Sequence, residues 1–225
     1  MVSQTNEQAL ESAIEQYLTG TCLEDIKQIK EESSDYTATE VPFTENHGYQ
    51  VGYANDFNAQ YAIDEKFFWN FLENSQEKEL EKLKKFGADW RRKVIERFDR
   101  LARKHGLLYL LKKGLAVDDA HLNLMYPAPL ASSSEQIHNN FKQNIFSSTR
   151  QVRYSLDNTL EEVDMVLFIN GLPFASMELK NPWTGQTARY HGIKQYKNDR
   201  DSRQTLFQFG RCLVHMAVED RKSVV

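Results

Sequence analysis

The chain has 225 residues, a formal net charge of −4 and only two cysteines, Cys22 and Cys212. Its length and apolar content suit one large domain, or two smaller ones, with a proper core. No apolar run approaches the roughly 20 residues that cross a bilayer, and the polar N-terminus lacks a signal-peptide pattern. The two distant cysteines argue against a zinc centre or a disulfide framework, so we expect a cytoplasmic protein.

Charge is distributed unevenly along the chain. Residues 1–81 contain 17 acidic and 4 basic residues, whereas residues 82–113 contain 12 basic and 3 acidic residues. A basic block inside an acidic protein indicates either a solvated helix face or a helix that contacts phosphates or a partner. Arg91 and Arg92 are candidate DNA-binding residues in this block.

The first half of the chain is predicted to be mainly helical. Apolar residues with a period near 3.6 predict a helix over residues 5–18, opened by a capping box of Thr5 and Gln8. The acidic row of Glu7, Glu11 and Glu15 fits a solvent-exposed face, or a helix whose Glu11 points toward a functional site. The elements expected next are an irregular acidic segment (20–46), a short strand (48–53), a helix (64–72), one long helix from Ser75 to Gly106, and a further helix (107–113). Residues 75–113 then form a basic helical insertion.

The second half alternates strands and helices. The pattern predicts a strand (121–126), a helix opened by a capping box (132–141), a strand carrying Arg150 and Arg153 (146–154), a hairpin (163–180), a helix (184–197) and a last buried strand (211–218). The expected fold class is therefore α/β, with a mixed central β-sheet flanked by helices, whose core spans residues 121–218 within a single domain of residues 1–225.

The hairpin carries the most informative polar residues. Two apolar runs flank Asn170-Gly171, the strongest short-range signal for a hairpin. Asp164 lies near the outer end of the first run, and Glu178 and Lys180 lie at the outer end of the second. Since side chains alternate along a strand, Glu178 and Lys180 point to the same face.

The register decides whether Asp164 joins them. A regular hairpin with a two-residue loop at Asn170-Gly171 puts Asp164 opposite Met177, on the face away from Glu178. One extra residue corrects this. A loop with Gly171 as a G1 bulge puts Asp164 opposite Ser176 and diagonally beside Glu178, about 7–8 Å away. We predict this bulge, or an equivalent one between residues 164 and 178.

Such a cluster is suited to a hard divalent cation. Mg²⁺ takes oxygen ligands, usually one or two carboxylates and several waters. Asp164, Glu178 and the backbone carbonyl of Leu179 are the candidate ligands, with Glu11 as a possible addition. A bound ion polarises a phosphodiester and lowers the pKa of an attacking water, and Lys180 can orient that water or stabilise the developing charge.

The same residues also match a known family. Asp164…Glu178-Leu-Lys180 looks like the PD-(D/E)XK nuclease motif. With Trp183-Thr-Gly-Gln-Thr-Ala188, Gln195-Tyr196 and Arg211-Cys-Leu-Val-His-Met-Ala-Val218, the string from Val163 to Asn181 resembles the N-terminal nuclease domain of the R (motor) subunit of type I restriction enzymes. This likeness implies a restriction-endonuclease-like fold that cleaves double-stranded DNA with Mg²⁺, for which Mn²⁺ can substitute.

The resemblance also assigns roles to residues. Asp164 and Glu178 would hold the metal and Lys180 would be the catalytic lysine. The family has a Gln-x-x-x-Tyr motif on the next helix. Gln186 and Tyr190 fit the spacing of this motif. Tyr196 lies nearer the position expected for the motif's tyrosine, but the residue four positions before it is Gly192 and not glutamine. Gln195 could take the place of that glutamine. These four residues are DNA-binding candidates.

The resemblance further implies a larger assembly. In the family, an ATP-driven translocase follows the nuclease domain, and modification and specificity subunits are partners. We therefore expect this chain to be a fragment that lacks the translocase, and ATP to be a cofactor of the full-length protein only. Two alternatives remain: a non-catalytic DNA-binding or docking module with a vestigial site, and a metal-dependent hydrolase of other phosphoesters.

Overall fold

A five-stranded mixed sheet organises the protein. The computed structural model describes residues 2–32, 47–158, 160–180 and 186–219. The strand order is β1-β6-β7-β8-β9, comprising Tyr49–Val51, Phe146–Arg153, Glu162–Ile169, Leu172–Lys180 and Val214–Glu219. The central strands β6, β7 and β8 are antiparallel neighbours, whereas β1 and β9 run parallel to the strands they flank. This confirms the predicted mixed α/β sheet.

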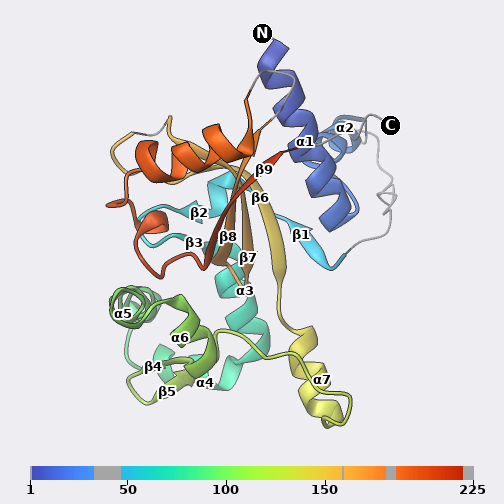
Figure 1. Cartoon of the computed structure of the whole chain (residues 1–225). Helices are drawn as coiled ribbons and strands as arrows, with labels where there is room; N and C mark the ends of the chain where they lie inside the picture. Colours follow the sequence, from blue (N-terminus) through green and yellow to red (C-terminus); the bar gives the residue numbers. More distant parts are fainter. Residues whose placement is uncertain (1, 33–46, 159, 181–185, 220–225) are drawn as a thin grey trace.

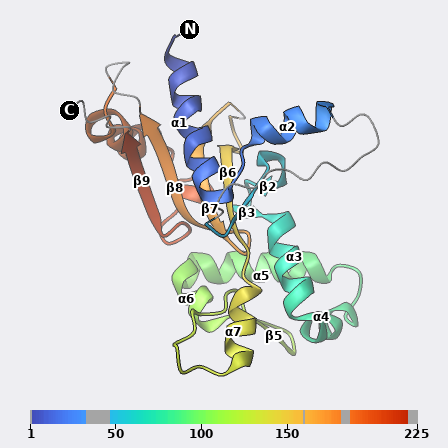
Figure 2. The same cartoon turned by 90° about the vertical axis from the view of Figure 1, so that its right-hand side faces the viewer.

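Helices cover both faces of this sheet (Figures 1 and 2). On one face, α1 (Val2–Thr19) packs through Leu10, Ile14 and Leu18 against apolar side chains of β7 and β8, and α2 (Leu23–Glu32) follows it. The opposite face is covered by a helix over residues 188–199, largely π-helical, and by the following loop. We call these two faces the α1 face and the loop face.

A helical layer lies at the hairpin-tip end of the sheet (Figures 1 and 2). Its helices are α3 (Glu65–Ser75), α4 (Glu77–Lys84), α5 (Trp90–His105), α6 (Leu107–Lys113) and α7 (Glu135–Lys142). Two small hairpins accompany them: β2 (Phe57–Asn58) with β3 (Ile63–Asp64), and β4 (Leu115–Val117) with β5 (Ala120–Leu122). The largest apolar cluster joins this layer to the hairpin through Ile169 and Leu172. In the described residues, no helix combines the length and apolarity needed to cross a membrane.

Several predicted elements differ from the structure. The long helix is broken into α4 and α5 around Gly87, whose φ of +114° is incompatible with a continuous helix. The predicted strand 121–126 is only Ala120–Leu122, and the last strand begins at Val214 and is a partly exposed edge strand. Both capping boxes were misplaced, because α1 already begins at Val2 and α7 begins only at Glu135. Part of the segment predicted as irregular forms α2; residues 33–46, and residues 184–185 of the last predicted helix, lie outside the described residues.

The tip of the β7–β8 hairpin is a tight, buried turn. Asn170 and Gly171 have φ values of +51° and +74°, the pattern of a two-residue type I′ turn. Asn170 is fully buried; its side chain accepts from the Ile145 N–H and donates to the Leu124 carbonyl. The Gly171 carbonyl accepts from the Asp64 N–H at the start of α3. The turn therefore fixes the hairpin to the helical layer.

The predicted register shift is present, but not at Gly171. Ile169 pairs with Leu172 and Phe168 with Pro173, as in a regular two-residue hairpin. The register then shifts between Leu167 and Phe168, so that Leu167 pairs with Ala175 and Met165 with Met177. Phe174 is the extra residue. The predicted G1 bulge at Gly171 was wrong, because both turn residues adopt positive φ. The predicted pairing of Asp164 with Ser176 was also wrong, because the extra residue lies on β8 and Ser176 pairs with Val166. An equivalent bulge between residues 164 and 178 is confirmed.

The turn leads to a test of how the hairpin is anchored. A Cβ atom at Gly171 would lie 2.3 Å from the Asp64 carbonyl oxygen and 2.6 Å from the Phe68 nitrogen, both backbone atoms that cannot move aside. We expect Gly171→Ala to lower the free energy of unfolding by about 3 kcal/mol or more, measured by urea denaturation. Gly48→Ala is the control, since Gly48 has φ +88° and open space around it, and should cost about 1 kcal/mol. Equal losses would contradict the docking of the tip.

Candidate active site

The register brings three charged residues together at the open end of the hairpin. Continuing the pairing of Met165 with Met177 by one residue puts Asp164 opposite Glu178, on the same face as Lys180. The Leu179 N–H donates to Asp164 Oδ2 at 2.6 Å, and Lys180 Nζ lies 4.0 Å from Glu178 Oε2. Glu178 is fully buried, Lys180 nearly so, and Asp164 half-buried. The strands thus hold two carboxylates and an ammonium group in a mostly buried cluster.

Arg200 belongs to this cluster, although the sequence analysis did not single it out. Its Nε donates to Glu178 Oε1 at 3.0 Å, and its Nη2 donates to the same oxygen. Its Nη1 donates to the Tyr154 hydroxyl at 3.0 Å, which in turn donates to Glu161 at 2.9 Å. Arg200 follows the helix on the loop face and lies 22 residues after Glu178, so no local spacing pointed to it.

Burial dominates the electrostatics of the two carboxylates. Burial, and then the negative charge of Asp164, raise the pKa of Glu178 to about 7, against the opposing effects of Arg200 and Lys180. Burial also raises the pKa of Asp164, while the Leu179 N–H and Lys180 act in the opposite direction. Burial therefore disfavours the ionised form of both carboxylates, a cost that an added cation would offset.

The donor set fits a hard divalent cation. Glu178 Oε2 is buried without a hydrogen-bond partner, an arrangement that leaves one carboxylate oxygen available for a ligand. Across the described residues, no group of three or more His, Cys, Asp or Glu side chains is arranged to hold a metal. Two carboxylates are nevertheless what Mg²⁺ commonly takes from a protein, because it keeps several of its waters.

Helix α1 brings both Glu7 and Glu11 within electrostatic reach of Asp164, but only Glu7 also interacts with Lys180. Both oxygens of Glu11 are engaged, one by Arg150 Nε at 3.0 Å and the other by Gln151. Glu7 is half-buried and its Oε1 has no hydrogen-bond partner. Burial raises the pKa of Glu7. Lys180 acts to lower this pKa and Asp164 acts to raise it, so the Glu7 carboxylate lies within electrostatic reach of both residues.

The acidic row of α1 is not a solvent-exposed face: Glu11 and Glu15 are buried and Glu7 is half-buried. Arg150, on the α1 face of β6, contacts Glu11, Glu15 at 3.4 Å and Glu24 of α2 at 2.8 Å. Glu11 and Glu15 are 2% and 0% exposed. The wet-face interpretation failed because the guanidinium that neutralises these carboxylates lies more than 100 residues away in sequence. This cluster fixes α1 and α2 to the sheet.

The Gln and Tyr candidates are placed differently from one another. The Tyr196 hydroxyl lies 2.9 Å from Ser176 Oγ, which also lies 2.7 Å from His215 Nδ1, and burial raises the pKa of Tyr196. Gln195 has a buried Oε1 without a hydrogen-bond partner. Tyr190 is 69% exposed and Gln186 is half-buried. Tyr196 therefore anchors its helix to β8, two residues before Glu178.

Gly192 explains why glutamine is absent four residues before Tyr196. A Cβ atom at Gly192 would lie 2.7 Å from the Cβ of Ala217 on β9. The helix approaches the sheet so closely here that any side chain would need to displace the strand. Gln195, one turn away on the same helix, is the glutamine nearest this position.

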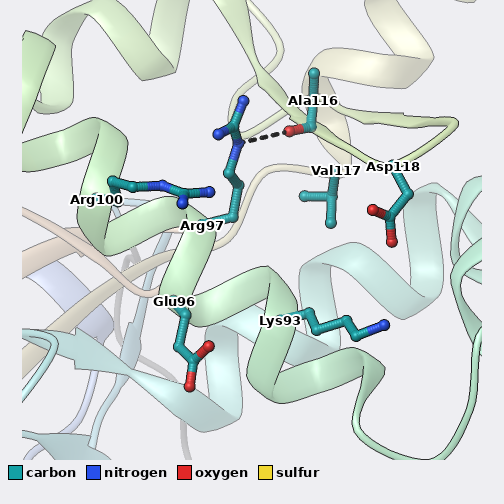
Figure 3. A pocket seen from close by; sticks show the side chains of 7 residues that line it. All are labelled: Lys93, Glu96, Arg97, Arg100, Ala116, Val117 and Asp118. Carbon is teal, nitrogen blue, oxygen red and sulfur yellow. Dashed lines mark hydrogen bonds between the residues drawn. The ribbon is translucent and has the colours of Figure 1, made fainter.

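The basic helix α5 lies at the hairpin-tip end, away from the carboxylates (Figures 1 and 2). Arg91 pairs with Glu73 and stacks over Trp69 and Trp90, and Arg92 pairs with Asp89 at 2.9 Å. Beside them lies a groove of about 450 Å³ between α5 and the β4–β5 turn (Figure 3). Its lining residues are Lys93, Glu96, Arg97, Arg100, Ala116, Val117 and Asp118.

Comparison with known families identifies the chain. Residues 29–224 match the family described as type I restriction enzyme R protein N terminus, which covers most of the sequence. The chain belongs to this family. Searches of curated proteins and of solved structures gave no significant match. The family membership confirms the resemblance found in the sequence and agrees with the restriction-endonuclease-like arrangement of the sheet.

The buried position of Arg150 gives a prediction about stability. Arg150→Met leaves Glu11 and Glu15 buried without their cation, so we expect the free energy of unfolding at pH 7 to fall by about 3–5 kcal/mol in urea denaturation. Arg153→Met is the control on the same strand, because Arg153 is 67% exposed and 4.0 Å from Glu162. It should change stability by less than about 1 kcal/mol. A small effect of Arg150→Met would show that the cluster does not hold α1 in place.

Proposed function

We propose that this chain is the endonuclease domain of a type I restriction enzyme R protein and hydrolyses phosphodiester bonds of double-stranded DNA with Mg²⁺. The observation that carries this proposal is the register shift that pairs Asp164 with Glu178 beside Lys180. It gathers the buried carboxylate of Glu178, which has one oxygen without a partner, the half-buried carboxylate of Asp164 and an ammonium group on one face. Family membership supports the substrate class.

Each residue has a role that follows from its position. Asp164, Glu178 and the Leu179 carbonyl would hold the ion, and Glu7 is better placed than Glu11 to add a carboxylate. When bound, Mg²⁺ supplies a Lewis acid for the phosphodiester and lowers the pKa of the attacking water. Lys180, nearly buried beside Glu178, orients the water or stabilises negative charge on the phosphoryl oxygens.

DNA contacts would come from two regions. Near the cluster, the helix over residues 188–199 and the segment just before it carry four candidates: Gln186, Tyr190, Gln195 and Tyr196. Tyr190 is the exposed one and is the most accessible to a DNA backbone. At the far end, Lys93, Arg97 and Arg100 recur at helical spacing along the groove. Among the described residues, Lys93 and Arg100 have no ion-pair partner, and Arg97 uses only Nε, on the Ala116 carbonyl (Figure 3).

The wider assembly is inferred from the family. Modification and specificity subunits would be partners through the full-length R protein, and ATP hydrolysis would belong to its translocase. The free, buried Cys22 and Cys212 suit a cytoplasmic location.

Cleavage assays test the catalytic assignment. In the full-length R protein assembled with its partner subunits, we expect Asp164→Asn, Glu178→Gln and Lys180→Gln each to reduce DNA cleavage by at least about 100-fold, since each removes a metal ligand or a charge that acts in the transition state. ATP-driven translocation should be unchanged. Both are measured on a circular plasmid, by agarose gel and by ATP turnover.

The control for these variants is Glu162→Gln. Glu162 lies two residues before Asp164 on the same strand, is half-exposed and is 4.0 Å from Arg153. Its substitution should leave cleavage intact. Normal cleavage by Asp164→Asn with normal translocation would exclude catalysis by this site and favour the alternative, a DNA-binding or docking module.

Salt dependence tests which part of α5 contacts DNA. Charge that contacts phosphate contributes a slope of about −0.9 to the dependence of log affinity on log salt. We expect the triple variant Lys93→Ala, Arg97→Ala and Arg100→Ala to weaken duplex binding and to reduce the slope by about 2–3. The double variant Arg91→Ala and Arg92→Ala, whose charges are already paired, should change it by less than 1. Binding is measured by fluorescence anisotropy with Ca²⁺; equal slopes for wild type and triple variant would exclude the groove.

A further inference from the structure

Arg200 is an unusual neighbour for a metal ligand. Its side chain is 12% exposed and two of its nitrogens bind Oε1 of the fully buried Glu178. Oε2 of the same carboxylate has no hydrogen-bond partner. One oxygen of Glu178 is therefore committed to a guanidinium, while the other is left for Lys180, 4.0 Å away, or for a ligand.

The charges of the cluster show what Arg200 does there. Asp164, Glu178 and Glu7 are the carboxylates, and Lys180 and Arg200 are the cations that act on them. Glu219 of β9, which pairs with Lys180 across the strands, adds a further carboxylate. Lys180 and Arg200 therefore already offset part of the negative charge of the site before any metal binds. A divalent ion at Glu178 would add two positive charges a few ångströms from a buried guanidinium, and in a poorly solvated site that repulsion is strong.

Arg200 also has a second attachment that does not depend on Glu178. Its Nη1 binds the Tyr154 hydroxyl, and its guanidinium carbon lies 5.2 Å from the centre of the Tyr154 ring. The Tyr154 hydroxyl in turn donates a hydrogen bond to Glu161. When its hold on Glu178 weakens, the guanidinium therefore keeps one hydrogen bond and a cation–π contact, which offset part of the cost of losing the carboxylate.

We propose that Arg200 is a resident counter-cation that competes with a divalent metal ion for Glu178, and so limits how tightly the site holds that ion. In the absence of metal it stabilises the buried carboxylates. The positive charge of Arg200 opposes binding of the metal ion, and the negative charge of a phosphodiester in the site would offset that repulsion. This inference rests on the proposed metal-dependent function, and it makes Arg200 a positioning residue.

Metal affinity without DNA tests the proposal. We expect Arg200→Gln to bind Mn²⁺ about tenfold or more tightly than the wild-type chain, measured by isothermal titration calorimetry at pH 8.5, where Glu178 is ionised. Arg203→Gln is the matched control. Arg203 lies in the same loop but is 87% exposed and pairs with Asp201, so its loss should leave the affinity unchanged. Unchanged or weaker binding by a folded Arg200→Gln variant overturns the proposal.

Two further variants make the result decisive. Tyr154→Phe removes the second attachment of Arg200 but keeps the ring. If Arg200→Gln fails to fold, the Tyr154→Phe affinity decides: Mn²⁺ binding weakened two- to threefold supports competition by Arg200, because the guanidinium then holds Glu178 more firmly, and unchanged or tighter binding overturns it. Glu178→Gln separates the two proposals. If it abolishes Mn²⁺ binding while Arg200→Gln leaves it unchanged, only the role of Arg200 fails; if no variant and no wild-type chain binds Mn²⁺, the metal-dependent function fails as well.

Discussion

One extra residue in β8 places Asp164, Glu178 and Lys180 on the same face of the sheet. Pairing across the hairpin is regular at the turn, and Phe174 then shifts it by one position. Side chains alternate along a strand, so without that shift Asp164 would point to the α1 face, away from Glu178 and Lys180. With it, the carboxylates meet on the loop face. A local irregularity of the backbone thus decides whether the charged residues form a site.

The register set by the bulge is kept because hydrogen bonds fix both ends of the hairpin. At the tip, Asn170 and Gly171 form hydrogen bonds to the segment before β6 and to the start of α3, so the hairpin cannot slide. At the open end, the Leu179 N–H binds the Asp164 carboxylate and ties the two strands across the cluster. The helical layer and the charged cluster are therefore joined through one hairpin, whose tip residues Ile169 and Leu172 lie in the largest apolar cluster.

Two arginines neutralise the buried carboxylates on the two faces of the sheet. On the α1 face, Arg150 meets Glu11, Glu15 and Glu24, and this interaction attaches the N-terminal helices. On the loop face, Arg200 meets Glu178. The difference between them is structural. Arg150 contacts three carboxylates from two helices, whereas Arg200 contacts the single carboxylate of Glu178 and the Tyr154 hydroxyl. In each cluster one buried carboxylate oxygen, of Glu15 or of Glu178, has no hydrogen-bond partner.

The sequence by itself determined the hairpin, its turn residues, the polarity of its open end and the mixed α/β class, because period-two alternation and Asn-Gly are local signals. Parity alone also required a bulge between residues 164 and 178. Its place was misassigned to Gly171, although Pro173, which cannot donate to a strand ladder, marked the neighbouring position.

The tertiary structure decided what local patterns cannot contain. Arg150 reaches α1 from 139 residues away, and Arg200 reaches Glu178 across 22 residues and a helix. The break between α4 and α5, the edge position of β9 and the close approach of Gly192 to Ala217 likewise depend on packing. The physical reason is that a charge is neutralised by whichever partner the fold brings near it, and sequence distance carries no information about that partner.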